Sequence, residues 1–196
     1  MNEIEQSAAD EAPQQVFALK KTIVMVGMMG AGKTAVGRGL AHLLGVPFRD
    51  SDHEIELAAN MTVPEIFARD GEPFFRQREA EVIARLMKGP ACVLSTGGGA
   101  FLNAGVRETI DAHGVALWLD ASLDTLWDRV KHKDTRPLLR TANPRQTLSE
   151  IFDARRPIYS LARLRTDIAP HRSIDETTDQ VLRTLAHAPD ILDTPA

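Results

Sequence analysis

The sequence contains few of the features that mark secreted or membrane-spanning proteins. Its 196 residues include one cysteine, Cys92, so no disulfide bond can form within the chain. Cys92 lies in the apolar run 91–94, where we expect a buried thiol rather than a nucleophile. No run reaches the roughly 20 apolar residues of a membrane span, and no basic-then-apolar signal pattern opens the chain. We therefore expect a cytoplasmic protein with no membrane partner.

Glycine is absent after residue 114, whereas positive charge is concentrated in that part of the chain. All 13 glycines lie at or before Gly114, which leaves later turns to proline and predicts a largely helical second half. Residues 129–172 carry 11 Lys and Arg against 4 Asp and Glu, although the net charge of the chain is −4. Such a segment suits a phosphate-rich small ligand, a nucleic acid or merely a solvated helix face. The acidic total argues against a nucleic-acid partner.

The two ends of the chain hold little that can pack. Residues 1–15 include four acidic and no basic residues, so we expect a disordered acidic tail. Residues 188–196 contain Pro189 and Pro195 and are expected to form a second tail. One domain would then span residues 16–187.

Between these ends, short apolar runs alternate with segments of helical periodicity. The predicted strands are Thr22–Val26, 46–48, 91–94, 115–119 and, with a weaker pattern, 165–168. The predicted helices are Lys33–Leu44, 72–87, 106–112, Leu123–Val130 and 147–161. Strands that are apolar throughout and alternate with amphipathic helices indicate an α/β domain with a parallel sheet covered on both faces.

A phosphate-binding motif follows the first predicted strand. The segment from Gly27 to Thr34 spells GMMGAGKT, which fits the pattern G-x-x-x-x-G-K-[ST]. The strand before it and the helix after it disfavour a glycine-rich turn that binds nothing. Backbone N–H groups of such a loop hold phosphates, its lysine reaches the β- and γ-phosphates, and its threonine ligates Mg²⁺. The residues expected to bind the nucleotide here are Gly27, Gly30, Ala31, Gly32, Lys33, Thr34 and Ala35.

Kinases, GTPases and motor ATPases share this loop, so the loop alone does not name a reaction. The sequence has no Asn-Lys-x-Asp stretch for recognising guanine, which disfavours a GTPase, and it is short for a mechanical ATPase. Transfer of a phosphoryl group to an acceptor molecule is the remaining interpretation.

Two carboxylates, Asp50 and Asp52, follow the second predicted strand, at the edge of the sheet where ligands bind. Alternation along an extended chain points both the same way, so one can help to hold hydrated Mg²⁺ while the other faces an acceptor hydroxyl. Alternatively, they cap a helix that begins near His53, with Asp52 as a capping residue. An EF-hand loop is excluded because Ile55 stands where glycine is needed, and the histidines show no metal-ligand spacing.

Six short segments, taken together in this order, resemble the shikimate kinase family. They are 27–34, 50–52, 71–79, 97–99, 136–139 and 155–159. The resemblance implies a three-layer, nucleoside-monophosphate-kinase-like P-loop fold with a central five-stranded parallel sheet covered by helices. It also implies substrate-binding helices at about 50–88 and a mobile lid at about 131–146.

The activity implied by the resemblance is that of a transferase. An ATP-dependent kinase would phosphorylate the 3-hydroxyl of shikimate to shikimate 3-phosphate, in the chorismate route to aromatic amino acids, with ATP and Mg²⁺ as cofactors. We expect a monomer because no long apolar stripe is left over for a partner. Two other interpretations stay open: a kinase for another small polyol acid such as gluconate, and a nucleotide-gated binding module without catalysis.

On the acceptor side, the resemblance assigns Asp52 to the shikimate hydroxyls, where it would receive or orient the reacting proton. Arg76 and Arg155 would hold the shikimate carboxylate, a role that suits planar guanidinium groups because they bind carboxylates through paired hydrogen bonds. Three consecutive glycines would lose backbone entropy without benefit unless a ligand approaches closely. The residues expected to close round the acceptor are Gly97, Gly98 and Gly99.

The residues alone leave another interpretation of each arginine open. Arg76 can be a surface charge paired with Glu72 or Glu79 on one helix face. Arg155 and Arg156 are adjacent, so at most one of them faces inward, and only the family pattern selects Arg155.

On the nucleotide side, the resemblance implies that Arg136 swings in from the lid toward the phosphates and that Arg129 lies against adenine. Arg140 is a near alternative for the first task, and the segment 170–172 is a further candidate for contact with adenine. The residues expected to carry catalysis are Asp52, Lys33 and Arg136.

The expected metal ligands are Thr34 and Asp50, the latter acting through water. No strand ends in the usual metal-binding aspartate opposite the loop, because the run 91–94 is followed by Ser95. Asp120 is an alternative carboxylate, but the family pattern favours Asp50.

Overall fold

The computed structural model describes residues 17–132 and 137–193 of the chain. The expected acidic tail 1–15 and the lid residue Arg136 lie outside these ranges. Within the described ranges, no helix combines the length and the apolar character that a membrane span requires.

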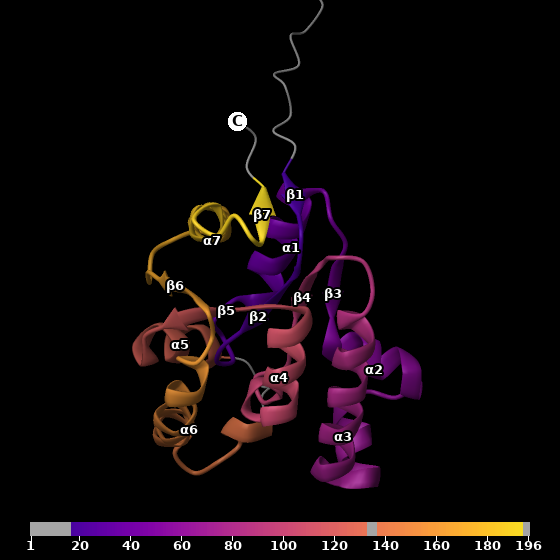
Figure 1. The fold of residues 1–196 in the computed structure, drawn as a ribbon. Coiled ribbons are helices and arrows are strands. Elements are labelled where there is room, and N and C mark those ends of the chain that lie inside the picture. Colours follow the sequence, from indigo (N-terminus) through magenta and orange to yellow (C-terminus); the bar gives the residue numbers. More distant parts are fainter. Residues whose placement is uncertain (1–16, 133–136, 194–196) are drawn as a thin grey trace, which may run out of the picture.

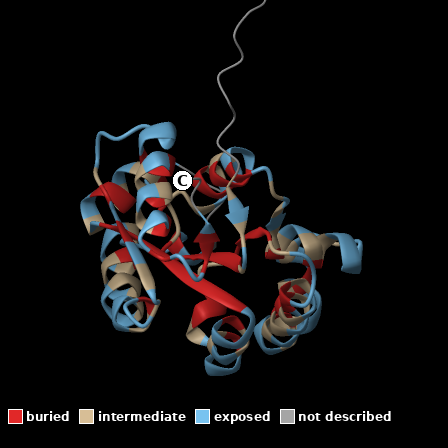
Figure 2. Ribbon diagram, turned by 45° about the horizontal axis from the view of Figure 1, so that its top comes forward, coloured by how far each residue is buried: buried red, intermediate tan, exposed pale blue. Residues whose placement is uncertain are grey.

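A five-stranded parallel sheet forms the centre of the molecule (Figure 1). Its strands, in spatial order, are β3 (Phe48–Asp50), β4 (Val93–Ser95), β2 (Thr22–Val26), β5 (Gly114–Ala121) and β6 (Leu164–Ile168). Every residue of β2, β4 and β5 is buried, as Figure 2 shows, because apolar runs without alternation can be satisfied only when both faces of a sheet are covered. The predicted fold class and strand number are confirmed.

Helices cover both faces of this sheet (Figure 1). They are α1 (Lys33–Leu44), α2 (Ser51–Ala59), α3 (Val63–Met87), α4 (Ala104–His113), α5 (Leu123–Val130), α6 (Pro144–Tyr159) and α7 (Ile174–Ala186), with short 3₁₀ turns η1 (Ala100–Leu102) and η2 (Pro137–Leu139). Helices α1 and α7 pack together on one face, and α4 packs on β5 at the other. Helices α2 and α3, which cover the region 50–88 expected to bind the substrate, form one side of the molecule, and α5 and α6 form the opposite side (Figure 1).

The second strand begins later than predicted, at Phe48 rather than at residue 46, and ends at Asp50. Asp50 has an extended backbone, and its side chain accepts hydrogen bonds from the N–H groups of Asp52 and His53. The helix cap that the sequence placed in part on Asp52 is therefore supplied by Asp50. Asp50 thus ends the strand and caps α2, which begins at Ser51, two residues before the start near His53 that the capping alternative predicted.

Helix α3 is longer than the predicted helix 72–87 and is broken at Gly71, whose φ of 81° and ψ of 170° are not helical. The part before the break begins with a capping box, in which Thr62 and Glu65 satisfy each other's backbone N–H groups. This part was not predicted because Gly71 and Pro73 lie in the middle of the pattern.

A second, small core lies between α2 and α3. Ile55 and Ile66 pack there with Phe75, separately from the main core around the sheet. This cluster fixes both helices to each other and thereby places the side chains of α3 that face the P-loop.

The expectation of a tail from residue 188 is wrong for residues 188–193. Ile191 and Leu192 are almost completely buried, and β7 (Leu192–Asp193) pairs antiparallel with β1 (Ala18–Leu19). Asp190 also forms two hydrogen bonds with the Arg163 guanidinium, at 2.7 and 2.8 Å. Pro189 follows the end of helix α7 and does not prevent the apolar residues after it from packing.

The interpretation of Cys92 as a buried thiol is confirmed. Its relative exposure is 4%, and its Sγ lies 3.9 Å from the Thr22 hydroxyl. Burial raises the pKa of Cys92, so the thiol stays protonated and unreactive at neutral pH.

Candidate active site

The loop between β2 and α1 adopts backbone conformations that require glycine. Gly27 and Gly30 have φ angles of 139° and 84°, which L side chains rarely adopt. A Cβ atom on Gly27 would also lie 2.9 Å from the carbonyl oxygen of Leu119, and one on Gly30 would lie 2.8 Å from Val130. The loop therefore curls tightly against β5 and α5.

The positive groups of this loop face inward. Lys33 Nζ donates hydrogen bonds to the carbonyl oxygens of Gly27, at 2.9 Å, and Met28, at 3.0 Å. Gly32 caps α1 without a side-chain hydrogen bond, so the first N–H groups of the helix receive no side-chain acceptor. A lysine ammonium and a helix N-terminus at the same place form an anion site.

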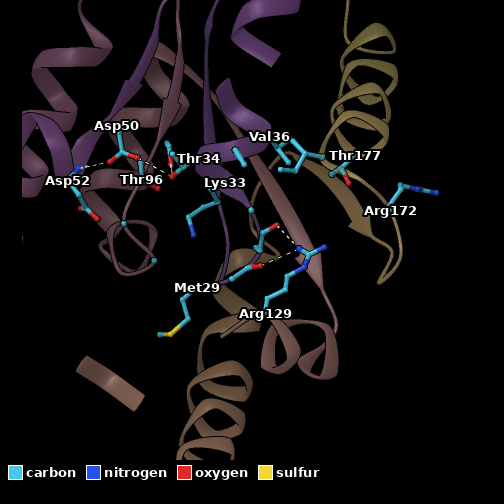
Figure 3. A pocket seen from close by; sticks show the side chains of 18 of the residues that line it. Met29, Lys33, Thr34, Val36, Asp50, Asp52, Thr96, Arg129, Arg172 and Thr177 are labelled. Atoms are coloured by element: carbon cyan, nitrogen blue, oxygen red, sulfur yellow. Dashed lines mark hydrogen bonds between the residues drawn. The ribbon is translucent and has the colours of Figure 1, made fainter. Parts of the chain in front are cut away.

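A cavity of about 490 Å³ opens over the loop. Figure 3 shows Asp50 and Asp52 at one side of this cavity, Lys33 at its centre, and Arg172 and Thr177 at the opposite side. Of the predicted nucleotide-binding residues, those that line it are Gly30, Ala31, Gly32, Lys33, Thr34, Ala35 and Arg129. Gly27 is not among them; it lies at the start of the loop, where its carbonyl accepts from Lys33.

Arg129 reaches the loop from α5. Its Nη1 donates to the carbonyl oxygens of Gly30, at 3.3 Å, and Ala31, at 3.4 Å. The sequence also offered the segment 170–172, of which Arg172 lines the cavity together with Ile174 from the start of α7. Periodicity did not reveal Ile174, because a single exposed isoleucine carries no pattern.

Thr34 and Asp50, the expected metal ligands, are in contact. The Thr34 hydroxyl donates to Asp50 Oδ2 at 3.2 Å and lies 3.3 Å from Ser95 Oγ. Strand β4 ends in Ser95, which has no carboxylate. Asp50 is paired with Ser95 on the neighbouring strand β3, so its carboxylate lies beside the end of β4.

The oxygen atoms present suit a hydrated Mg²⁺ ion. Within the described ranges, no three His, Cys, Asp or Glu side chains form a metal-binding group. Mg²⁺ keeps several waters and takes one or two protein ligands together with phosphate oxygens. One hydroxyl and one carboxylate beside a phosphate cradle fit that requirement, whereas a zinc site needs more protein ligands.

Asp120, the alternative carboxylate, forms ion pairs with two arginines. Its side chain is 6% exposed and pairs with Arg156 at 3.1 Å and with Arg165 at 3.0 Å. It does not line the cavity over the loop. Of these two carboxylates, Asp50 is the one that lines the cavity over the loop.

A second, smaller cavity of about 170 Å³ adjoins the first. It brings together all the predicted acceptor residues, which are Asp52, Arg76, Gly97, Gly98, Gly99 and Arg155. Asp52 lines both cavities. Apolar side chains complete the wall, namely Met29, Val63, Phe67, Phe75 and Leu138.

Arg76 combines the two interpretations that the sequence allowed. Its guanidinium pairs with Glu79 at 2.8 Å and with Glu72 at 3.1 Å. It nevertheless lies directly over Gly99, because a Cβ atom there would be 2.5 Å from Arg76 Nη2. The ion pairs hold the arginine at the cavity wall, where its side chain remains 30% exposed.

Glu79 is a site residue that the sequence analysis missed. It is 1% exposed, and burial raises its pKa against the lowering effect of Arg76. One of its oxygens, Oε1, has no hydrogen-bond partner within the described part of the chain, and the same holds for Asp52 Oδ1. In the sequence, a glutamate three residues after an arginine is typical of a surface ion pair on a helix. Only its burial shows that Glu79 belongs to the site.

Asp52 is the second carboxylate of this cavity. Burial raises its pKa, as does the negative charge of Asp50, while Lys33 and Arg76 act in the opposite direction. A carboxyl group in this environment holds a proton more readily than one in water, which suits a group that accepts a proton from an alcohol.

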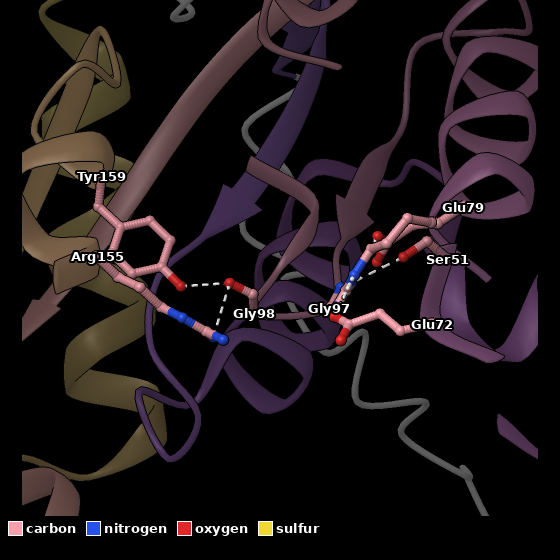
Figure 4. Close-up of polar contacts among 8 residues, drawn as sticks. Ser51, Glu72, Glu79, Gly97, Gly98, Arg155 and Tyr159 are labelled. Atoms are coloured by element: carbon pink, nitrogen blue, oxygen red, sulfur yellow. Dashed lines mark hydrogen bonds and ion pairs between the residues drawn. The ribbon is translucent and has the colours of Figure 1, made fainter. Parts of the chain in front are cut away.

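The two adjacent arginines of α6 point apart, as expected. Arg155 Nη1 donates to the carbonyl oxygen of Gly98 at 3.4 Å, whereas Arg156 pairs with Asp120. The Tyr159 hydroxyl donates to the same carbonyl oxygen of Gly98. Figure 4 shows Arg155 and Tyr159 on one side of the glycine turn and Glu72 and Glu79 on the other.

Comparison with known proteins identifies the family. The family model for shikimate kinase matches residues 29–186, and a shikimate kinase of Ruegeria pomeroyi is 58% identical over 98% of this chain and 99% of its own length. The chain belongs to the shikimate kinase family. A family member from Cereibacter sphaeroides is 56% identical over 98% of this chain and 96% of its own length. The expected family and its enzyme class, a kinase, are thus confirmed.

Solved structures agree with this assignment. A shikimate kinase from Acinetobacter baumannii in complex with shikimate is 38% identical, has a TM-score of 0.80, and covers 85% of this chain and 93% of its own. A gluconokinase from Sinorhizobium meliloti has a TM-score of 0.57 at 19% identity, covering 86% and 93% of the two chains, which shows a shared fold alone.

Proposed function

We propose that this chain transfers the γ-phosphoryl group of ATP to the 3-hydroxyl of shikimate, forming shikimate 3-phosphate and ADP for the chorismate route. The observation that carries the proposal is the position of Asp52, which lines both the nucleotide cavity and the small cavity between Arg76 and Arg155. An acceptor hydroxyl at Asp52 would face the phosphate bound beside Lys33.

The nucleotide side supplies charge and positioning. Lys33 and the N-terminus of α1 attract the β- and γ-phosphates, and the lysine exchanges its contacts with loop carbonyls for phosphate oxygens. Thr34 and, through water, Asp50 would hold Mg²⁺, which neutralises phosphate charge as the transfer proceeds. Arg129 and Arg172 line the part of the cavity where the base and ribose would lie. Arg136 stays a predicted phosphate ligand.

The acceptor side matches the chemistry of a small hydroxylated acid. A carboxylate between Arg76 and Arg155 would form charge-assisted hydrogen bonds with both guanidinium groups. The unpartnered oxygens of Asp52 and Glu79 would accept hydrogen bonds from hydroxyl groups of the same molecule. As the 3-oxygen bonds to phosphorus and the bond to the ADP oxygen breaks, Asp52 takes the hydroxyl proton.

The rival interpretations make different demands on this site. A module without catalysis has no need of a carboxylate at the junction of the two cavities. Gluconate is an open chain, longer than a ring acid, and the cavity of about 170 Å³ between the arginines suits the compact ligand better.

A coupled assay of ADP release tests the proposal. The enzyme is incubated with MgATP and, in parallel, with shikimate, gluconate or nucleoside monophosphates. Of these acceptors, we expect only shikimate to support turnover. Chelation of Mg²⁺ should abolish this turnover, and added Mg²⁺ should restore it. Turnover with gluconate alone, or with none of these acceptors, would contradict the proposal.

Three further features of the protein belong to the same proposal. A small-molecule kinase of this kind would act in the cytoplasm, as a monomer and without a nucleic-acid partner. Size-exclusion chromatography with light scattering checks the monomer, for which the expected mass is 21.5 kDa.

A further inference from the structure

Tyr159 is the only tyrosine of the chain, and the function described so far gives it no role. It stands in the last turn of α6, is 1% exposed, and its ring stacks on Trp118 with the centroids 6.4 Å apart. Its hydroxyl donates to the carbonyl oxygen of Gly98 (Figure 4). Burial raises the pKa of Tyr159, so the hydroxyl stays protonated and remains a donor.

Two side chains of α6 share this one acceptor. Arg155 and Tyr159 are four residues apart, so they lie on one face of the helix. The bond from Arg155 Nη1 to Gly98 is long, at 3.4 Å, and the arginine also lines the acceptor cavity. When Arg155 turns to a ligand carboxylate, the hydroxyl of Tyr159 is the donor that remains on Gly98.

The Gly98 carbonyl fixes the direction of the next N–H group. The described residues contain no cis peptide bond, so the N–H of Gly99 points opposite to the carbonyl of Gly98 and therefore away from α6. Within the described ranges, no backbone carbonyl accepts a hydrogen bond from this N–H. Arg76 also lies against Gly99, because a Cβ atom on that glycine would come within 2.6 Å of the Arg76 guanidinium.

This peptide unit would turn over easily without a restraint. It joins two glycines, for which left-handed and right-handed backbone conformations cost nearly the same. A turned peptide would direct the Gly98 carbonyl oxygen, with its partial negative charge, to the side on which Gly99 now presents its N–H. An anionic ligand held by Arg76 and Arg155 would then lose a donor and be repelled.

We propose that Tyr159 is a positioning residue of the acceptor site: its hydroxyl holds the Gly98–Gly99 peptide so that the Gly99 N–H faces the acceptor's carboxylate. The inference rests on the proposed function, because it requires a carboxylate between Arg76 and Arg155. Tyr159 itself does not line the acceptor cavity.

The variant Tyr159→Phe tests this role because it removes the hydroxyl and keeps the ring that stacks on Trp118. We expect the KM for shikimate to rise about three- to ten-fold, which corresponds to the loss of one hydrogen bond. The KM for ATP should be unchanged, and kcat should stay within about two-fold of the wild-type value. The matched control is Ser160→Ala, at the end of the same helix. It removes the hydrogen bond of 2.7 Å that the Ser160 hydroxyl donates to the carbonyl oxygen of Pro157. The control should leave all three constants unchanged.

An acceptor substrate without a negative charge distinguishes a positioning role of the Tyr159 hydroxyl from a general effect on packing. The methyl ester of shikimate keeps the hydroxyls and loses the negative charge. If Tyr159 acts through the Gly99 N–H on the carboxylate, Tyr159→Phe raises the KM for the acid but changes that for the ester less than about two-fold. Equal factors for acid and ester, an unchanged KM for the acid, or a variant that no longer folds would each overturn the proposal. Wild-type enzyme that fails to phosphorylate shikimate would instead refute the proposed function.

Discussion

Asp52 and Glu79 turn unpartnered carboxylate oxygens toward one residue, Gly97. A Cβ atom there would lie 3.0 Å from Asp52 Oδ1 and 2.9 Å from Glu79 Oε1, and neither oxygen has a hydrogen-bond donor within the described part of the chain. Buried acceptors without donors cost free energy, which a ligand with several hydroxyl groups would recover. The glycine leaves the space for such a ligand.

The variant Glu79→Gln should change the pH dependence of stability. Burial raises the pKa of Glu79 above its ordinary value of 4.5. Between 4.5 and the raised pKa, the folded protein holds a proton that the unfolded chain has lost, so the free energy of unfolding falls as the pH rises through this window. Glutamine does not titrate. The variant should therefore gain stability relative to wild type as the pH rises from about 4 to about 8.

Urea unfolding at a series of pH values measures this difference. The matched control is Glu81→Gln, which removes an exposed carboxylate from the same helix, paired with Arg78 at 2.6 Å. Its stability relative to wild type should vary little with pH. A difference between Glu79→Gln and wild type that stays constant over the whole range would contradict the raised pKa.

The variant Asp52→Asn should lose catalysis and keep nucleotide binding. Asparagine retains the size of the side chain but cannot take the proton of the acceptor hydroxyl, so kcat should fall by about 10²- to 10⁴-fold. The dissociation constant for ATP, measured by calorimetry, should change little, and the exposed control Asp111→Asn should keep full activity. An unchanged kcat for Asp52→Asn would remove this residue from the mechanism.

The adjacent arginines of α6 provide a paired test of the carboxylate anchor. Arg155→Ala should raise the KM for shikimate about 10- to 150-fold, because it removes a charge-assisted hydrogen bond. The KM for ATP should not change. Arg156→Ala removes the same side chain from the next position, where it pairs with Asp120, which keeps Arg165 as a partner. Its KM for shikimate should stay near that of wild type. Similar effects of the two variants would refute the assignment of Arg155.

The sequence was most informative where one local rule determines the structure. The helices Lys33–Leu44 and Leu123–Val130 were predicted from their helical periodicity with the bounds that the structure shows. In the structure the first begins at the phosphate-binding loop and the second at Ser122, whose side chain caps it. The loop motif likewise predicted Lys33 and Thr34, since their roles follow from spacing alone. The order of the later motifs supplied Arg76 and Arg155, which residue chemistry by itself left undecided.

The features that the sequence did not reveal depend on contacts between distant segments. The burial of Glu79 arises from α3 packing beside the glycine turn, and the ordering of Leu192 depends on the strand that begins at Ala18. For Asp50 the sequence offered metal binding and helix capping as alternatives. In the structure they do not exclude each other, because the cap of α2 and the contact with Thr34 use different oxygens of the same carboxylate.

The variant Gly99→Ala should weaken shikimate binding without weakening the fold. Gly99 has a φ of −94° and a ψ of −17°, which alanine adopts without strain. A Cβ atom there would lie 2.5 to 2.6 Å from the Arg76 guanidinium, which is the end of a flexible side chain and would move away from the cavity. We expect the KM for shikimate to rise about ten-fold or more, with an unchanged KM for ATP and an unchanged unfolding midpoint. The control Gly105→Ala places a methyl group 3.4 Å from its nearest neighbour, Asn103 Oδ1, and should alter neither constant. If Gly99→Ala bound shikimate as tightly as wild type, Arg76 could not be an anchor for its carboxylate.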